Sequence, residues 1–328
     1  MENSIFKYGK DIEWSLPLLF QYEPVLITIN DCLEFYGIKP GKVNLFGAPS
    51  CMWAGGRVPA VGISVDIPQI RKVFNFLKTY NAIPTFTFSY TNITKYNLED
   101  SYCNSLLDLG IEIGARFIVY SDLLRDYIKE KSPNSTVVAS VIKPSFRFQG
   151  DEKLEEPTIE NETNYYNQLL KEYDVVVVRP EYSRKVLIEH PEYIDDISRI
   201  EVLINQPCMT ECPRCQEHYR SQQASRLNYN TVSKKFACIC NTMTPKEFAD
   251  LTLAHTEEEV KKLVANGVNK LKLQGRGVGH PIYHLLYNLY YSMFNTDGKN
   301  YLPAEYLYVN FERNMDRFNS LFEQRHNY

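Results

Sequence analysis

Short apolar segments, rich in β-branched or aromatic residues, recur along the chain, and polar, glycine or proline residues end each of them. A continuous apolar run such as residues 175–178 is typical of a strand that is covered on both faces, as in a parallel sheet. Eight segments of this kind are therefore predicted to be strands. They are residues 43–46, 85–88, 117–120, 137–142, 175–178, 201–204, 236–240 and 270–273.

Helical patterns lie between most of these segments. At residues 256–266, Thr256 precedes three glutamates, which predicts a capped first turn, and Gly267 predicts the end of the helix. The alternation of strands and helices favours a (β/α)8 barrel, with a doubly wound open sheet as the next choice. The other predicted helices are residues 67–80, 98–109, 122–131, 163–173, 183–190, 216–225 and 245–251.

The predicted barrel extends from residue 43 to residue 300. Residues 1–42 are interpreted as an N-terminal lead-in with a helix near 31–36, and residues 301–328 as a C-terminal helical extension. A chain of 328 residues is long for one domain, but a barrel of about 250 residues with extensions needs no second core. The acid-rich run at 150–162 is interpreted as a solvated loop and is assigned no chemistry.

Composition and charge exclude several classes of protein. Hydrophobic residues make up 44% and charged residues 23%, a balance that excludes a largely disordered chain. The net charge of −4 gives no overall positive field toward RNA or anionic lipid, so neither partner is indicated by charge. No run of about 18 apolar residues occurs, and charges interrupt the apolar runs at the start. We therefore expect a cytoplasmic protein without a membrane span.

Five of the eight cysteines lie within 33 residues, which indicates a metal site more than disulfides in a cytosolic protein. Cys208, Cys212 and Cys215 have the spacing Cys-x3-Cys-x2-Cys, and a single loop can bring three such thiolates to one centre. Cys238 and Cys240 lie two apart on a predicted strand, so both point to the same side and either could be the fourth ligand. The predicted metal loop spans residues 205–240.

Two metal groups compete for this loop. Zinc usually takes four cysteines in paired Cys-x2-Cys spacings, whereas a 4Fe-4S cluster binds four thiolates with less regular spacings. The loop follows a strand at the rim where barrel enzymes keep their chemistry, which favours the iron–sulfur cluster over zinc. Radical S-adenosylmethionine enzymes share the cysteine spacing, but their loop follows the first barrel strand, whereas this one follows the sixth predicted strand.

Two glycine-rich segments are predicted to bind an anionic substrate at the same rim. Gly275 and Gly277 flank Arg276 after the last predicted strand, where backbone N–H groups and a guanidinium can bind phosphate or carboxylate. After the first predicted strand, Trp53 offers a flat stacking surface and Arg57 a second cation. The alternatives are a plain glycine turn in each segment and a structural salt bridge for Arg276.

Other residues are also predicted to face this rim. Arg179 follows the fifth predicted strand and is a candidate for substrate binding. His218 lies three residues beyond Cys215, close enough to act as a general acid or as a neighbour of the cluster, and a packed histidine is the alternative. Arg220 and Arg226 belong to the segment best suited to contact RNA, although composition alone favours a solvated basic face.

Several of these motifs together resemble a known family. Residues 201–205, the cysteine loop, the pair at 218–219 and residues 270–276 resemble peptidase family U-32, the collagenase-like peptidases. Residues 47–57, 91–92 and 120–123 resemble a little-studied branch of that family, so the likeness covers about residues 43–280. In two respects the chain departs from the family: its cysteine spacing is compressed, and Gln274 stands where the family usually has glutamate.

The resemblance implies a barrel with a 4Fe-4S cluster on four cysteines. Better-understood members hydroxylate ubiquinone precursors or RNA bases without molecular oxygen, some with prephenate as the implied oxygen donor. We therefore expect oxygen-independent redox or hydroxylation chemistry on a small anionic or RNA-borne substrate, with an electron donor as partner. Peptidase activity is not expected, because the chain lacks Gly-x-Ser-x-Gly, His-Glu-x-x-His and an evident Cys/His dyad. The alternatives are a barrel with structural zinc that acts in binding or assembly, and an RNA-modification factor.

Overall fold

Eight parallel strands close into a barrel in the computed structural model of the protein, with β1 paired to β8. The structure describes residues 6–17, 19–20, 23–35, 43–56, 58, 66–206, 208–227, 238–274, 282–295 and 304–321. The closed barrel of parallel strands confirms the predicted (β/α)8 fold. The strands are β1 (Glu13–Leu16), β2 (Val43–Gly47), β3 (Ala82–Phe88), β4 (Arg116–Val119), β5 (Val137–Ala139), β6 (Val175–Val178), β7 (Ile200–Leu203) and β8 (Lys270–Lys272).

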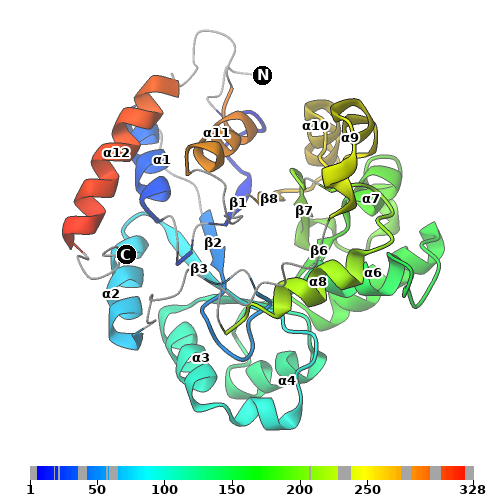
Figure 1. Ribbon diagram of the computed structural model, residues 1–328, viewed down its shortest axis with the longest axis horizontal. Helices are drawn as coiled ribbons and strands as arrows, with labels where there is room; N and C mark the ends of the chain where they lie inside the picture. The colour runs from blue at the N-terminus through cyan, green and yellow to red at the C-terminus, as the bar shows by residue number, and fades with distance from the viewer. Residues whose placement is uncertain are drawn as a thin grey trace.

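Helices surround the strands, and Figure 1 shows α12 (red) beside α1 (blue) at the outer edge. The α-helices are α1 (Glu23–Phe35), α2 (Ile67–Lys78), α3 (Ser101–Ile113), α4 (Asp122–Lys131), α5 (Ile142–Phe148), α6 (Ile159–Glu172), α7 (Pro180–Tyr182), α8 (Cys215–Gln223), α9 (Pro245–Leu251), α10 (Glu257–Ala265), α11 (Ile282–Met293) and α12 (Ala304–Leu321). Short turns are η1 (Lys95–Glu99), η2 (Ser183–Leu187), η3 (Pro191–Tyr193), η4 (Ile197–Arg199) and η6 (Ile239–Thr242). None of the described helices is both long and apolar enough to span a membrane.

Two predicted boundaries need correction. The first strand is β1, within the segment 1–42 that was predicted to be a lead-in, so that segment supplies the first strand and helix of the barrel. The predicted strand at 236–240 is wrong where it can be checked, because residues 239–242 form a 3-10 turn; residues 236–237 lie outside the described residues. The cysteine loop therefore follows the seventh strand of the barrel, not the sixth.

Charged side chains fill part of the barrel interior. Glu201, whose side chain is 1% exposed, accepts hydrogen bonds from Ser15 Oγ at 2.7 Å and from Lys272 Nζ at 2.8 Å. Arg116 lies 3.8 Å from the same carboxylate and also pairs with Glu13. Burial alone would raise the pKa of Glu201, but Lys272 and Arg116 outweigh it and hold the pKa below its ordinary value.

An apolar cluster fills the rest of the interior. The ammonium group of Lys272 lies 4.4 Å from the ring centre of Phe46, so a cation–π contact joins the charged and apolar parts. Cores of this kind are packed and leave no pore through the barrel. The cluster consists of Phe46, Ile118, Val138, Val175 and Val177.

The helices bury their apolar faces against the outside of the barrel. In α2, Phe74 is fully buried, and burying such a side chain contributes roughly 1.5–3 kcal/mol. The predicted start of α10 is confirmed: Thr256 and Glu259 form a reciprocal capping box. Gly267 follows the helix with a positive φ of 101°, as its predicted role as a helix stop requires.

We expect Lys272→Met to destabilise the protein by about 3–5 kcal/mol, because it leaves the charge of Glu201 without its closest counter-charge inside the barrel. Urea unfolding at pH 7 measures this. Adding Glu201→Gln to Lys272→Met should recover much of the loss. Lys261→Met is the control, because its ion pair with Glu257 is exposed, and it should change stability little. Equal effects of the two lysine variants would contradict this account.

Candidate functional site

The cysteine loop leads from β7 to α8 at the C-terminal rim of the barrel. Cys212 and Cys215 are buried and Cys208 is half-buried. The segment 251–253 lies alongside the loop: the backbone N–H of Thr210 donates to residue 251 at 2.8 Å, and Cys208 O accepts from residue 253 at 2.7 Å. These bonds fix the start of the loop from outside it.

Two thiols of the loop, those of Cys208 and Cys212, are in hydrogen-bond contact. The hydrogen bond from the Cys208 thiol lowers the pKa of Cys212 to about 6, and the backbone N–H of Arg214 adds to this effect. Burial raises the pKa of Cys215 to about 12, and the neighbouring charge of Cys212 acts in the same direction. The thiol of Cys212 is therefore deprotonated more easily than that of Cys215.

Cys238, a candidate fourth ligand, lies near the same loop. The hydrogen bond with Glu217 is the main cause that raises the pKa of Arg214. The charges of Cys212 and Cys238 raise this pKa further, because both sulfurs are near the guanidinium. The side chain of Cys240, the other candidate, lies outside the described residues. Within the described part of the chain, no three His, Cys, Asp or Glu side chains are placed to hold a single metal ion.

A buried charged trio lies beside the loop. Arg179 Nη1 is 3.1 Å from Glu162 Oε1, and Arg179 Nε is 3.5 Å from Glu181 Oε2, with all three side chains at most 4% exposed. Burial raises the pKa of Glu162 to about 7 against the opposing pull of Arg179, and the charge of Glu181 adds to the rise. Arg179, predicted to bind substrate, is thus enclosed between two carboxylates of its own chain.

Trp53 was predicted to offer a flat stacking surface at the rim, but it lies in the core. Its side chain is fully buried, and its indole N–H donates to Asn97 O at 2.7 Å. Phe88 and Tyr127 meet the indole in edge-to-face contacts. The ring is therefore part of the core and does not offer an open stacking surface.

The glycine-rich segment around Trp53 packs directly on α8. Gly56 has a φ of +89°, and a Cβ there would lie 2.0 Å from Gln222 O, so no larger residue fits. This brings the end of β2 against the helix that follows the cysteine loop. The remaining rim residues predicted from sequence lie outside the described residues; they are Arg57, Gly275, Arg276 and Gly277.

Helix α8 carries the other predicted residues. His218 lies one turn beyond Cys215 and is partly exposed. Arg220 forms an ion pair with a glutamate of the acid-rich run at 2.6 Å, and the guanidinium of Arg226 lies 4.2 Å above the ring of Tyr90. Both arginines that were predicted to suit RNA are therefore engaged by groups of the protein itself.

A serine–histidine pair also lies near the loop and was missed, because its members are 72 residues apart in sequence. Ser183 Oγ is 2.7 Å from His255 Nε2, and burial lowers the pKa of His255 to about 4. Ser183 is fully buried and donates to Pro180 O at 2.8 Å. A substrate cannot reach this hydroxyl, so the pair does not form a hydrolytic nucleophile in this arrangement.

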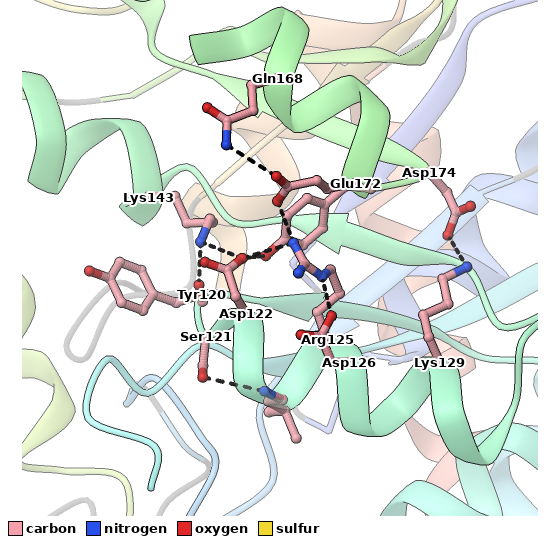
Figure 2. Close-up of polar contacts among 12 residues, drawn as sticks. Tyr120, Ser121, Asp122, Arg125, Asp126, Lys129, Lys143, Gln168, Glu172 and Asp174 are labelled. Carbon is pink, nitrogen blue, oxygen red and sulfur yellow. Dashed lines mark hydrogen bonds and ion pairs between the residues drawn. The ribbon is translucent and has the colours of Figure 1, made fainter.

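Asp122, at the start of α4, is the centre of a further polar network, drawn in Figure 2. Its carboxylate accepts from Tyr173 Oη at 2.7 Å, from Lys143 Nζ at 3.0 Å and from Arg125 at 3.0 Å. Burial alone would raise the pKa of Asp122, but these donors outweigh it and lower the pKa. Ser121 caps the start of α4, so Asp122 is not needed for that role. Asp122 instead joins α4 to α5 through Lys143, and to the end of α6 through Tyr173, as a structural anchor.

Comparisons with known proteins give one informative likeness. No protein-family model matches the chain, and no curated protein matches it. Among solved structures, the chain is similar to that of the U32 peptidase Mk0906, with a TM-score of 0.51 and 11% sequence identity. The match covers 82% of this chain and 94% of the other. At this identity the likeness shows a shared barrel fold.

We expect Glu162→Gln to stabilise the protein more at pH 8 than at pH 5. The pKa of Glu162 rises from the ordinary 4.5 to about 7 on folding. The contribution of this residue to the stability of the fold is therefore fully present below about pH 4.5 and is lost as the pH rises through about 7. A glutamine stays neutral and avoids this loss. The difference between variant and wild type in the free energy of unfolding should therefore increase by on the order of 2 kcal/mol between these pH values.

Urea unfolding at both pH values measures the effect. Glu160→Gln is the matched control, because Glu160 is exposed on the same helix, and its effect should not depend on pH in this way. A difference that falls as the pH rises would mean that the ion pair with Arg179 outweighs the burial of Glu162, and would contradict the raised pKa.

Proposed function

We propose that the protein is an iron–sulfur-dependent barrel enzyme of the U-32 type, with a 4Fe-4S cluster on Cys208, Cys212, Cys215 and one of Cys238 and Cys240. The observation that carries the proposal is that one loop, between β7 and α8, carries Cys208, Cys212 and Cys215, two of them buried. Barrel enzymes keep their reacting groups at this rim. The fold shared with the U32 peptidase Mk0906 supports the choice of family.

The donor set fits such a cluster. Four thiolates are the ligands that a 4Fe-4S cluster takes, and short loops with irregular spacing supply them. A single zinc ion with bonds of about 2.3 Å would need sulfurs about 3.8 Å apart. A cluster places several iron atoms between its ligands, so its sulfurs stand farther apart than those around one ion.

The residues of the chain would then bind and orient a substrate beside the loop. A bound cluster would supply one-electron redox chemistry, and an electron donor would be needed as partner. Arg57 and Arg276 would hold the anionic end of the substrate, helped by the backbone N–H groups of Gly275 and Gly277. His218, on the first turn after the loop, would donate or accept a proton.

The reaction that we propose is an oxygen-independent oxidation, reduction or hydroxylation of a small anionic or RNA-borne substrate. A cytoplasmic location would keep the thiols reduced and free to bind iron. Peptide hydrolysis is not part of the proposal, because Ser183, the serine paired with a histidine beside the loop, is buried.

A structural zinc site is the second candidate, in a barrel that acts in binding or assembly. Direct contact between the thiols of Cys208 and Cys212 favours it, because the ligands of a single ion stand close together. Under this alternative, metal binding stabilises the fold, and its loss unfolds the chain.

The test is metal analysis with electron paramagnetic resonance on anaerobically purified protein. We expect a brown protein with about four iron atoms per chain. Cys212→Ser should lose the colour and the resonance signal but remain folded. Cys103→Ser is the matched control: this thiol is buried in α3, outside the cysteine loop, so the variant should keep its iron.

A colourless protein with one zinc per chain, in which Cys212→Ser unfolds, would overturn the iron–sulfur proposal in favour of the zinc alternative. Iron lost equally from both cysteine variants would also count against the proposed ligands, because Cys103 is not among them.

A further inference from the structure

Two hydrogen-bond donors without acceptors lie together where the end of α8 meets the segments that follow β2 and β3. Gln223 is 3% exposed, and its Nε2 is buried without a hydrogen-bond partner in the described part of the chain. Three residues farther on, Nε of Arg226 is buried and also lacks an acceptor there. The backbone N–H of Arg226 donates to Gln223 O at 3.1 Å, so both residues belong to one turn. Unpaired buried donors are rare in proteins, and two on one turn point to an acceptor from outside the chain.

The amide of Gln223 is fixed with its oxygen toward the segment after β3. Thr91 Oγ1 donates to Gln223 Oε1 at 2.7 Å, and the backbone nitrogen of Thr91 lies 3.5 Å from the same oxygen. These two donors require an oxygen at that position, so the two ends of the amide cannot be exchanged without losing both contacts. The N–H groups of Nε2 therefore face away from Thr91.

The charge of Arg226 is held only by weak partners. Its guanidinium lies 4.2 Å above the ring of Tyr90, Nη1 is 3.4 Å from a backbone oxygen of its own turn, and Nη2 is 3.7 Å from Met52 Sδ. A ring face and a thioether are weak acceptors. Arg220, earlier on α8, pairs with Glu152, whereas no carboxylate of the described residues pairs with Arg226. The side chain of Arg226 is half-buried, so a small solute can reach it from solvent.

We propose that Arg226 and Gln223 form a binding site for a small oxyanion, a carboxylate or a phosphate, on the side of the rim where β2 and β3 end. An oxyanion is negatively charged and accepts hydrogen bonds without donating them, so it satisfies both donors and neutralises the guanidinium. The Nε–Nη2 edge of an arginine can bind two oxygens at once, and here only the thioether of Met52 contacts that edge. The site uses no cysteine and no metal, so the inference goes beyond the proposed function and does not depend on it.

The experiment is thermal unfolding of the full chain with increasing inorganic phosphate or, separately, sodium acetate, at an ionic strength held constant with sodium chloride. We expect one of the two probes to raise the Tm of wild type saturably, and the probe that binds more tightly identifies the group that is recognised. Binding to Arg226→Gln should be weaker on the order of tenfold, because a charge-assisted hydrogen bond is lost. Arg220→Gln is the matched control: the charge of Arg220 is already paired with Glu152, so this variant should bind as wild type does.

Gln223→Glu tests the second donor and covers the case in which Arg226→Gln does not fold. Glutamate keeps an acceptor for Thr91 but puts an oxygen in place of Nε2, so we expect it to abolish binding of the probe. Wild-type affinity in Arg226→Gln or in Gln223→Glu would overturn the inference, as would a wild type that binds neither probe saturably. An equal loss in Arg220→Gln and Arg226→Gln would also overturn it, because the effect would then be one of overall charge. Iron content is measured separately, so these results leave the test of the proposed function untouched.

Discussion

Parallel pairing of β1 with β8 closes the sheet, and this closure brings charges from distant parts of the sequence into one small interior. Glu201 on β7 lies beside Lys272 on the adjacent strand β8. Closure of the ring brings Ser15 on β1 and Arg116 on β4 to the same carboxylate. An unpaired charge in that space would cost several kcal/mol, so each side chain needs the strand that carries its partner. Closure and charge pairing therefore support each other.

The same closure sets the order of the segments at the C-terminal rim. The ends of β5, β6 and β7 are neighbours, so the segments after them meet: Gln149 after α5, Arg179 after β6 and the cysteine loop after β7.

The two buried charge clusters differ in the numbers of acidic and basic side chains they contain. The interior cluster has two acids and two bases, whereas the trio of Glu162, Arg179 and Glu181 has two acids and one base. The excess carboxylate lies beside the cysteine loop, where a change of charge is expected when thiols bind a metal.

The sequence predicted seven of the eight barrel strands and missed β1. β6, with four consecutive valines, was predicted with its bounds, because burial on both faces leaves a continuous apolar run. β1 was missed, because Glu13 and Ser15 face the charged interior and alternate with apolar residues, so the strand does not resemble its neighbours. Because β7 and β8 were predicted although Glu201 and Lys272 face the interior, polar interior residues weaken the signal that identifies a parallel strand but do not remove it.

At the candidate site, the sequence identified the cysteine loop but not the surroundings of the other predicted residues. The cysteine spacing identified the loop, because ligand spacing is local. Glu162 was assigned to a solvated acidic run, yet α6 turns it inward to Arg179, and no neighbour in sequence indicates that partner. Trp53 likewise lies in a glycine-rich segment that resembles an open loop, but its ring packs in the core against Phe88 of β3 and Tyr127 of α4.

The fold and the chemistry of this protein rest on different residues. A TM-score of 0.51 at 11% identity requires only that strands and helices recur in the same order, which the apolar pattern ensures. The cysteine loop at the rim is held by contacts of particular side chains, such as that of Cys215 with Gln149. Because the segment after α5 and the cysteine loop are joined by a few hydrogen bonds and not by strand pairing, substitutions there can change the loop while the barrel stays intact.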